Sequence, residues 1–276
     1  MKKKLLLVGV GIVLFIFVGL MIFKASSMFI NANAAQVSEP DIDNGAMLFE
    51  KAEKLISEGE LLKARNACLK IMEKFPNSAN IQKVQETLDD INIKILFSSI
   101  VTKDSFVYEV QKGDSLAKIS KNFNTTGELI MRSNGLKDNS LRIGKKLKIC
   151  KTRFSIVVDK SQNILTLKGD KDIVKTYRVA TGKNNCTPVG NFTIINKIVS
   201  PPWYPPTGGV VTSGDPKNVL GTRWMGISKP SYGIHGTIQP DSIGKSVTEG
   251  CVRLKNSEVE ELYAIVPVGT EVVIVD

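Results

Sequence analysis

His235 is the only histidine among the 276 residues of the chain, and Cys251 follows it sixteen positions later. A thiol attacks as a nucleophile after a base removes its proton, and imidazole has the unperturbed pKa that suits this task near neutral pH. A lone histidine or cysteine is more often a packing residue than a catalytic one. The residue types beside the pair therefore decide which interpretation holds.

Two glycines and one arginine flank the pair at spacings that would serve a reacting site. Gly236 directly follows the histidine and Gly250 directly precedes the cysteine, where a missing side chain lets the backbone approach a substrate closely. Arg253 stands two residues after Cys251, so in an extended strand both side chains point to the same face. Because a nearby cation favours a thiolate, we expect a resting thiolate–imidazolium pair. Backbone N–H groups near Gly250 and Cys251 are expected to hold a developing oxyanion.

Several short motifs carry a resemblance to a known family. The run IHGT at 234–237, followed by TEGCVRL at 248–254, resembles the signature of the bacterial L,D-transpeptidase catalytic domain. The upstream run TGKNNCTPVGNFTI at 181–194 and the proline-rich PPWYPP at 201–206 are similar to that family's strand-and-turn segment and loop. The resemblance covers roughly residues 153–276.

This resemblance implies a peptidoglycan cross-linking enzyme of cell-wall biogenesis that needs no cofactor. Cys251 would form a thioester with a tetrapeptide stem, release D-alanine, and pass the acyl group to an amine in a 3→3 cross-link. The backbone carbonyl of Gly236 would orient the imidazole of His235. Stem contacts are implied for five further side chains: Arg253, Thr248, Tyr232, Trp203 and Tyr204.

Other interpretations stay open. Tyr232 fits core packing better than substrate binding, and Trp203 with Tyr204, between two proline pairs, fits a rigid loop as well as a cleft wall. Water could resolve the thioester in place of an amine, which would make the chain an L,D-carboxypeptidase or endopeptidase. A non-catalytic wall-binding anchor is a third class, although anchoring requires no His–Cys–Arg set. Glu249 departs from the histidine or arginine of many members, which leaves substrate detail open.

The four cysteines predict neither a metal site nor a disulfide framework. They are Cys68, Cys150, Cys186 and Cys251, without C-x-x-C spacing, and the presence of one histidine argues against a zinc site. A Cys150–Cys186 bridge stays open, and Cys186 is otherwise interpreted as structural.

The N-terminus predicts export from the cytoplasm. Lys2 to Lys4 precede the uncharged run Leu5 to Phe23, which is long enough to span a membrane as a helix with its N-terminus inside. The run from Ala32 to Ala34 resembles a signal cleavage site, so a removed signal peptide is the alternative. In both cases the bulk of the chain is expected in the bacterial cell envelope.

The net charge of +10 comes from 37 basic and 27 acidic residues. An exported chain rarely meets nucleic acid, so anionic wall polymers or lipid headgroups are the expected partners.

Apolar residues at three- and four-residue spacing predict helices between the N-terminus and residue 99. One runs from Ala46 to a break at Gly59, a second covers about 61–75, and a third lies near 81–97. The first two resemble a single tetratricopeptide-type hairpin. One such repeat cannot bury its faces as a solenoid does, so we expect a spacer or a small protein-docking unit, with a peptide-binding groove as the weaker option.

The segment 107–150 resembles a LysM domain in its order strand–helix–helix–strand and in the runs VQKGDSL and SNGL. That resemblance implies binding of glycan strands that contain N-acetylglucosamine. The implied glycan-binding residues are Gly113, Asp114, Ser115, Leu116, Asn134, Gly135 and Leu136. A capped helical pair without a ligand is the alternative.

After Lys151 the apolar residues alternate with period two, which predicts strands, and Ser257 to Glu260 fits a capping box before one late helix. The expected fold class is multidomain α+β, with a transmembrane helix, a small helical hairpin, a βααβ LysM-like module and a mostly-β sandwich. The expected divisions are 1–24 (anchor or signal), 25–45 (linker), 46–99, 106–150 and 152–276.

Overall fold

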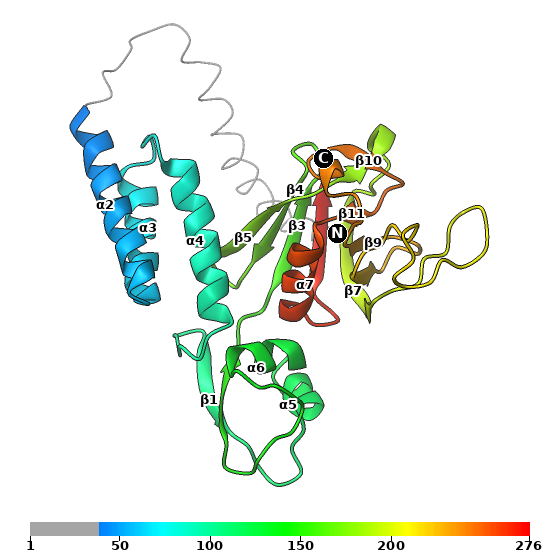
Figure 1. Ribbon diagram of the computed structural model, residues 1–276, viewed down its shortest axis with the longest axis horizontal. Helices are drawn as coiled ribbons and strands as arrows, with labels where there is room; N and C mark the ends of the chain where they lie inside the picture. The colour runs from blue at the N-terminus through cyan, green and yellow to red at the C-terminus, as the bar shows by residue number, and fades with distance from the viewer. Residues whose placement is uncertain (1–38) are drawn as a thin grey trace, which may run out of the picture.

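The computed structural model describes residues 39–276, and Figure 1 shows three units: helices α2 to α4, a small unit around α5 and α6, and a larger β-rich unit. The membrane or signal helix predicted within residues 1–24 lies outside the described residues. Among residues 39–276, no helix is both long and apolar enough to cross a membrane.

The first unit contains α2 (Glu39–Ser57), α3 (Leu61–Lys74) and α4 (Ile81–Leu96), which confirms the three predicted helices. The start of the first helix was predicted wrongly, because α2 begins inside the expected linker. Pro40 lies in the first turn of α2, where a proline does not break a helix because backbone N–H groups of that turn have no intrahelical acceptor. The three helices bury a common apolar core made of Phe49, Ala52, Ala64, Cys68, Ile71, Val84, Leu88, Ile91 and Ile95.

The second unit has the predicted order of two strands around two helices. β1 (Ser105–Glu109) pairs antiparallel with β2 (Lys146–Cys150), and α5 (Leu116–Asn122) and α6 (Gly127–Ser133) lie between them in the chain. The side chains of Ser115 and Thr126 cap the two helices by accepting backbone N–H groups. The unit has its own core of Val110, Leu116, Ile119, Ile130, Leu147 and Ile149.

The third unit is built on one curled sheet with the strand order β11-β9-β8-β7-β12-β3-β4-β5. These strands are β3 (Ser155–Asp159), β4 (Ile164–Lys168), β5 (Ile173–Arg178), β7 (Gly190–Val199), β8 (Arg223–Ile227), β9 (Gly233–His235), β11 (Val252–Arg253) and β12 (Glu271–Val275). The expected sandwich is therefore a single sheet, because the ten-residue β7 pairs with β12 on one side and β8 on the other. A separate parallel pair joins β6 (Thr181–Gly182) to β10 (Ser246–Thr248).

The helix α7 (Asn256–Ile265) covers the core of this sheet with Val259, Leu262 and Ile265, all fully buried. The capping residues were predicted wrongly by two positions. Glu258, not Glu260, accepts the backbone N–H of Lys255 at 3.3 Å. The helix therefore begins at Asn256, which directs the side chain of this residue toward the loops beside His235.

Helix α4 covers the open edge of the sheet, as Figure 1 shows. The backbone N–H of Thr176 on the edge strand β5 donates to the Asp89 carboxylate at 2.9 Å, and Asn92 donates to the Val174 carbonyl at 3.0 Å. Burial raises the pKa of the Asp89 carboxyl. These contacts occupy backbone groups that an edge strand otherwise leaves unpaired, so the helical unit and the sheet are docked by specific bonds.

Lys148 joins the second unit to the first. Its side chain is buried, and its Nζ donates to the carbonyls of Ile95 and Ser98 at 2.7 Å each, at the C-terminal end of α4. The C-terminus of a helix favours a cation, although burial lowers the pKa of Lys148. The Thr126 hydroxyl of α6 also donates to the Ala264 carbonyl of α7. The small unit is thus held by both of its neighbours.

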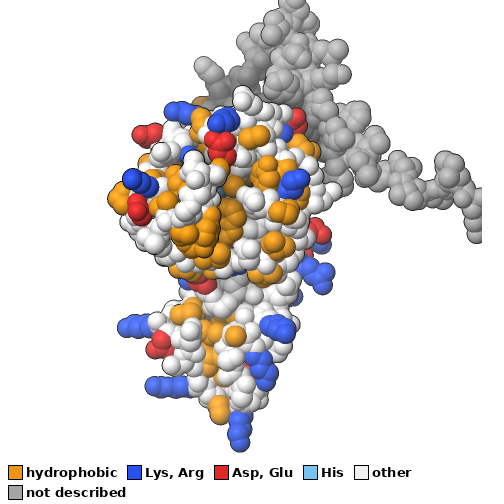
Figure 2. All heavy atoms as spheres, turned by 90° about the vertical axis from the view of Figure 1, so that its right-hand side faces the viewer, with side chains coloured by type: hydrophobic (Ala, Val, Ile, Leu, Met, Phe, Trp, Pro, Cys, Tyr) orange, Lys and Arg blue, Asp and Glu red, His pale blue; other side chains and the backbone are white. Residues whose placement is uncertain are grey.

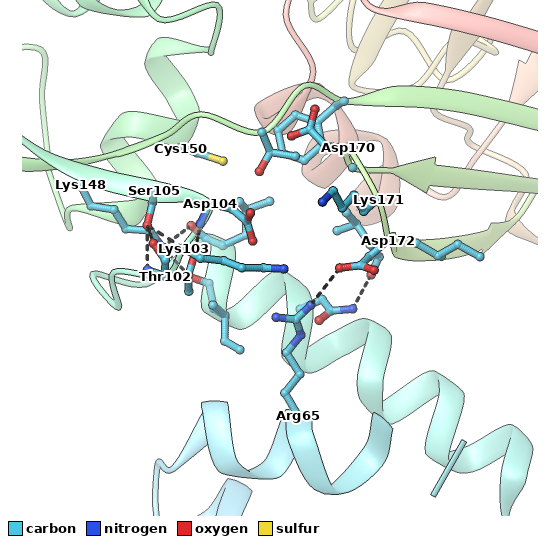
Figure 3. Close-up of a pocket in the computed structure, with 18 residues that line it drawn as sticks. Arg65, Thr102, Lys103, Asp104, Ser105, Lys148, Cys150, Asp170, Lys171 and Asp172 are labelled. Carbon is cyan, nitrogen blue, oxygen red and sulfur yellow. Dashed lines mark hydrogen bonds and ion pairs between the residues drawn. The ribbon is translucent and has the colours of Figure 1, made fainter. Parts of the chain in front are cut away.

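A cavity of about 400 Å³ lies where the three units meet. Figure 3 shows Arg65 directed toward Asp172 across it, with 3.9 Å between the charged atoms, and Lys148 and Cys150 on the opposite wall. None of the predicted site residues lines this cavity. All four cysteines are free, so the Cys150–Cys186 bridge is not formed, and Cys186 is exposed.

Candidate active site

The pairing of β9 with β11 brings the histidine, the thiol and the guanidinium to one place. The two strands run parallel, with Val252 opposite Ile234 and Arg253 opposite His235. Cys251 directly precedes β11 and lies two residues before Arg253. Extended geometry therefore directs the side chains of Cys251, Arg253 and His235 to the same face of the sheet.

His235 is 3 % exposed and is held by the backbone of its neighbour. Its Nδ1 lies 2.6 Å from the Gly236 carbonyl oxygen, which can only accept a hydrogen bond. The neutral ring therefore carries its proton on Nδ1 and leaves Nε2 as an acceptor. Burial lowers the pKa of His235 to about 4, although the bond to Gly236 opposes this change; the charge of Arg253 lowers the pKa further.

Cys251 is half-buried, and its Sγ lies 3.7 Å from the Ser231 carbonyl oxygen. Burial raises the pKa of the thiol, although a hydrogen bond from the Gly233 backbone and the charge of Arg253 both act to lower it. Burial thus acts against the charged form of both groups, which favours a neutral thiol beside a neutral imidazole over the thiolate–imidazolium pair expected from the sequence. The charge of Arg253 opposes the effect of burial at the thiol and adds to it at the imidazole.

The hydroxyl of Thr248 makes two hydrogen bonds within the turn that contains Cys251. This hydroxyl donates to the Cys251 carbonyl at 2.7 Å and accepts the Gly250 N–H at 3.1 Å. The Gly250 N–H is therefore occupied by the Thr248 hydroxyl, and its expected contact with an oxyanion stays a prediction. The Cys251 N–H makes no hydrogen bond within residues 39–276 and remains as a donor. Gly250 itself is required sterically, because its φ is +116° and a Cβ there would lie 2.6 Å from the Tyr232 ring.

Arg253 is 8 % exposed and is held by neutral partners. Its guanidinium donates to the Ser242 hydroxyl at 3.1 Å and to the Gln239 amide oxygen at 3.4 Å, and its Nε has no partner in the described part of the chain. No carboxylate of residues 39–276 forms an ion pair with it. Its positive charge is therefore not neutralised by these residues and can attract a substrate carboxylate.

The aromatic candidates differ in their surroundings. Tyr232 packs partly into the core and against Gly250, which agrees with the packing interpretation. Trp203 forms a bridge with Val211, and Tyr204 is 68 % exposed in the same loop.

Trp224 on β8 is an aromatic neighbour of the site that sequence reasoning missed. Its ring stacks beside that of His235, with ring centroids 6.0 Å apart and planes inclined by 20°. The residue types around Trp224 carry no signal for this role. Only the strand register, which sets Trp224 opposite His235, reveals it.

In the small unit, most of the candidate glycan-binding residues make contacts that hold the fold. Asp114 accepts hydrogen bonds from the Tyr108 hydroxyl at 2.7 Å and from the Gln111 N–H at 2.8 Å. Ser115 caps α5, and Leu116 is buried in the core.

The remaining candidates of this unit are Asn134, Gly113, Gly135 and Leu136. The side chain of Asn134 accepts the backbone N–H of Lys148 at 2.7 Å and donates to the backbone carbonyl of Lys148 at 2.9 Å. Gly113 and Gly135 have φ of +84° and +60°, which their turns require. Gly135 and Leu136 line a surface hollow, so they stay open to a ligand.

Comparison with known proteins finds two families in the chain. Residues 153–274 match the L,D-transpeptidase catalytic domain, and residues 108–149 match the LysM domain. The proteins named L,D-transpeptidase YkuD from Bacillus licheniformis and Bacillus subtilis are each 36 % identical to the chain over 174 residues, covering 60 % of this chain and 96 % and 97 % of the respective relatives. YqjB of Bacillus subtilis, also named as an L,D-transpeptidase, is 39 % identical over 127 residues, or 44 % of this chain and 70 % of the relative.

Among solved structures, an L,D-transpeptidase from Mycobacterium smegmatis aligns with a TM-score of 0.40 at 19 % identity. The alignment covers 49 % of this chain and 65 % of that chain, so this chain spans slightly less than two thirds of that protein.

Proposed function

This chain belongs to the L,D-transpeptidase family, and from that membership we propose that it cross-links peptidoglycan stems through a thioester on Cys251. One observation carries the assignment to this residue. The parallel register of β9 and β11 sets Arg253 opposite His235, with Cys251 two residues before it on the same face. A nucleophile, a base and a cation thus face one substrate position.

In the first half-reaction, Nε2 of His235 accepts the thiol proton while Sγ bonds to the carbonyl carbon of the third stem residue. The neutral imidazole is the competent form for this step, and the lowered pKa of His235 keeps it neutral. The Cys251 N–H donates to the oxyanion, and one such donor typically contributes about 3 kcal/mol to the transition state. The C–N bond then breaks, and D-alanine leaves with the proton from His235.

In the second half-reaction, an acceptor amine attacks the thioester carbon and gives a proton to Nε2. The C–S bond breaks, Sγ takes the proton back, and a 3→3 cross-link remains. Arg253 binds a carboxylate of the stem, because its guanidinium is not neutralised by the residues that surround it.

The LysM module supports binding to peptidoglycan glycan and an extracytoplasmic location. Residues 106–150 contain nine Lys and Arg against four Asp and Glu, and Figure 2 shows basic side chains projecting from this unit below the larger one. Such a surface attracts anionic wall polymers. The helix predicted within residues 1–24 would hold the chain at the cytoplasmic membrane.

The test is incubation of the purified chain with disaccharide-tetrapeptides, followed by mass spectrometry. We expect a dimer lighter than two substrates by one alanine, because D-alanine departs from the donor. Cys251→Ala should give no dimer while its circular dichroism spectrum stays unchanged. Tripeptide products without dimers would instead assign an L,D-carboxypeptidase, and dimers formed by Cys251→Ala would reject the thioester.

A further inference from the structure

Asn256, the first residue of α7, contacts the same peptide group that holds the imidazole of His235. Its Oδ1 accepts the backbone N–H of Thr237 at 3.0 Å. That N–H belongs to the peptide bond between Gly236 and Thr237, and the carbonyl of this bond lies 2.6 Å from Nδ1 of His235. One peptide plane is thus held at its N–H end by Asn256 and at its C=O end by the imidazole.

The amide oxygen of Asn256 also fixes a second loop beside the histidine. It accepts the backbone N–H of Thr222 at 3.2 Å. Because both neighbours are N–H donors, the contacting atom of the amide must be its oxygen. Asn256 therefore ties the loop before β8 and the loop after β9 to the start of α7.

Two glycines make room for this oxygen. A Cβ added to Gly236 or to Gly221 would lie 2.2 Å from Oδ1 of Asn256, closer than any real contact. Gly236 is therefore required by the Asn256 side chain and not only by substrate access. In the sequence, Gly236 follows His235, and Asn256 stands five residues after Cys251. In the fold, Gly236 and the Asn256 side chain pack against each other.

We propose that Asn256 is a positioning residue that sets the tautomer and orientation of His235 through the peptide bond between Gly236 and Thr237. This inference rests on the proposed role of His235 as the base. An N–H that donates to Oδ1 polarises its own peptide bond, which makes the Gly236 carbonyl a better acceptor for Nδ1–H. The proton then stays on Nδ1, and Nε2 remains free for the thiol.

The single histidine makes this relay directly measurable, because ¹⁵N NMR of the imidazole reports one residue without overlap. Three variants suffice. Asn256→Ala removes the acceptor, Asn256→Asp retains an acceptor oxygen, and Asn92→Ala removes an asparagine that bonds to the Val174 backbone outside the site. The same variants are assayed for kcat and KM on disaccharide-tetrapeptides.

We expect the wild-type protein and Asn92→Ala to show the Nδ1–H tautomer, and Asn256→Ala to show a mixture. Its kcat should fall roughly 10- to 100-fold with little change in KM, since a misplaced base affects the chemical step. Asn256→Asp should keep the tautomer, recover most of kcat, and shift the pH profile because a carboxylate raises the pKa of the ring.

An unchanged tautomer and kcat in folded Asn256→Ala would overturn the proposal, as would an Asn256→Asp protein that behaves like Asn256→Ala. Should Asn256→Ala not fold, Asn256→Asp decides alone, because loss of the Nδ1–H tautomer there would contradict the relay. The NMR comparison needs no substrate. A wild-type protein without turnover would therefore reject the proposed function and leave the tautomer test intact.

Discussion

Arg253 lies directly opposite His235 in the parallel pairing of β11 with β9. This relationship explains why Cys251 and Arg253 are separated by one residue, since both must share the face of the imidazole. It also brings a cation beside a base, and the charge of Arg253 contributes to the lowered pKa of His235. The guanidinium thus acts against a protonated imidazole, and we assign its main role to substrate binding.

Replacing Arg253 by glutamine should weaken substrate binding more than chemistry. The variant keeps a polar amide but loses the charge and the guanidinium contacts to Ser242 and Gln239. A lost charge-assisted hydrogen bond costs about 1.5–3 kcal/mol, which predicts an increase in KM of roughly 10- to 150-fold. Steady-state kinetics on disaccharide-tetrapeptides measure it, with the exposed Arg153→Gln as the matched control. A change confined to kcat would show that Arg253 acts elsewhere.

The alkylation rate of Cys251 should distinguish a neutral thiol from a resting ion pair. Because burial raises the pKa of this thiol above its ordinary value of 9.0, its reaction with iodoacetamide should still accelerate as the pH passes 9.0. The measurement uses a Cys186→Ser background, since Cys186 is exposed while Cys68 and Cys150 are buried. A rate that levels off near neutral pH would instead establish the thiolate–imidazolium pair.

The stability of the protein should depend on pH through His235. The pKa of the ring is lowered from 6.5 to about 4 by folding, so the unfolded chain binds a proton between these values while the folded chain does not. Stability is therefore fully present above pH 6.5 and falls as the pH decreases toward 4, by about 2–3 kcal/mol between pH 7 and 4.5. Urea unfolding of wild type and His235→Gln at both values measures this contribution. An equal loss in the two proteins would contradict the lowered pKa.

The sequence predicted those parts of the structure that depend on nearby residues. The helices of the first unit follow from apolar spacing, and the order of the small unit follows from local turns and caps such as Ser115. The bond from His235 to the Gly236 carbonyl was expected from the family resemblance and joins adjacent residues.

Contacts between distant segments were not predictable in this way. The stacking of Trp224 beside His235 depends on strand register, and the reach of Asn256 depends on where α7 begins. The raised pKa of the Cys251 thiol depends on burial by several elements, which residue types alone do not reveal. The start of α2 was missed because residues 25–45 were interpreted as a linker, although the first turn of a helix tolerates a proline.

Substituting Gly236 by alanine should disturb both the fold and the base. Its Cβ would lie 2.2 Å from Oδ1 of Asn256 and 3.1 Å from Cγ1 of Val259, so the Asn256 contacts must shift. Overpacking of this kind typically costs about 1–3 kcal/mol, and the backbone carbonyl that holds the imidazole should shift as well. Thermal unfolding and the cross-linking rate measure the two effects. Gly127→Ala is the matched control, because the atom nearest to its Cβ would be 3.8 Å away; equal behaviour of the two variants would contradict the steric argument.

Replacing Lys148 by methionine should loosen the LysM module from the helical unit. Methionine keeps the apolar stem but leaves the Ser98 carbonyl without a donor and removes one of the donors to the Ile95 carbonyl, which should cost about 1–3 kcal/mol in unfolding free energy. Hydrogen exchange at the C-terminal turn of α4 should become faster. Lys146→Met, on the same strand but exposed, is the control and should change neither measurement.

The functional consequence of Lys148→Met should depend on the substrate. On soluble disaccharide-tetrapeptides the rate should stay unchanged, because Lys148 does not contact the β9–β11 face. On intact cell-wall sacculi the rate should fall, since a loosened module no longer holds the glycan at a fixed distance from Cys251, and the effective concentration of stems decreases. Equal rates of Lys148→Met and Lys146→Met on sacculi would show that the glycan-binding module acts as a tether and that its orientation does not matter.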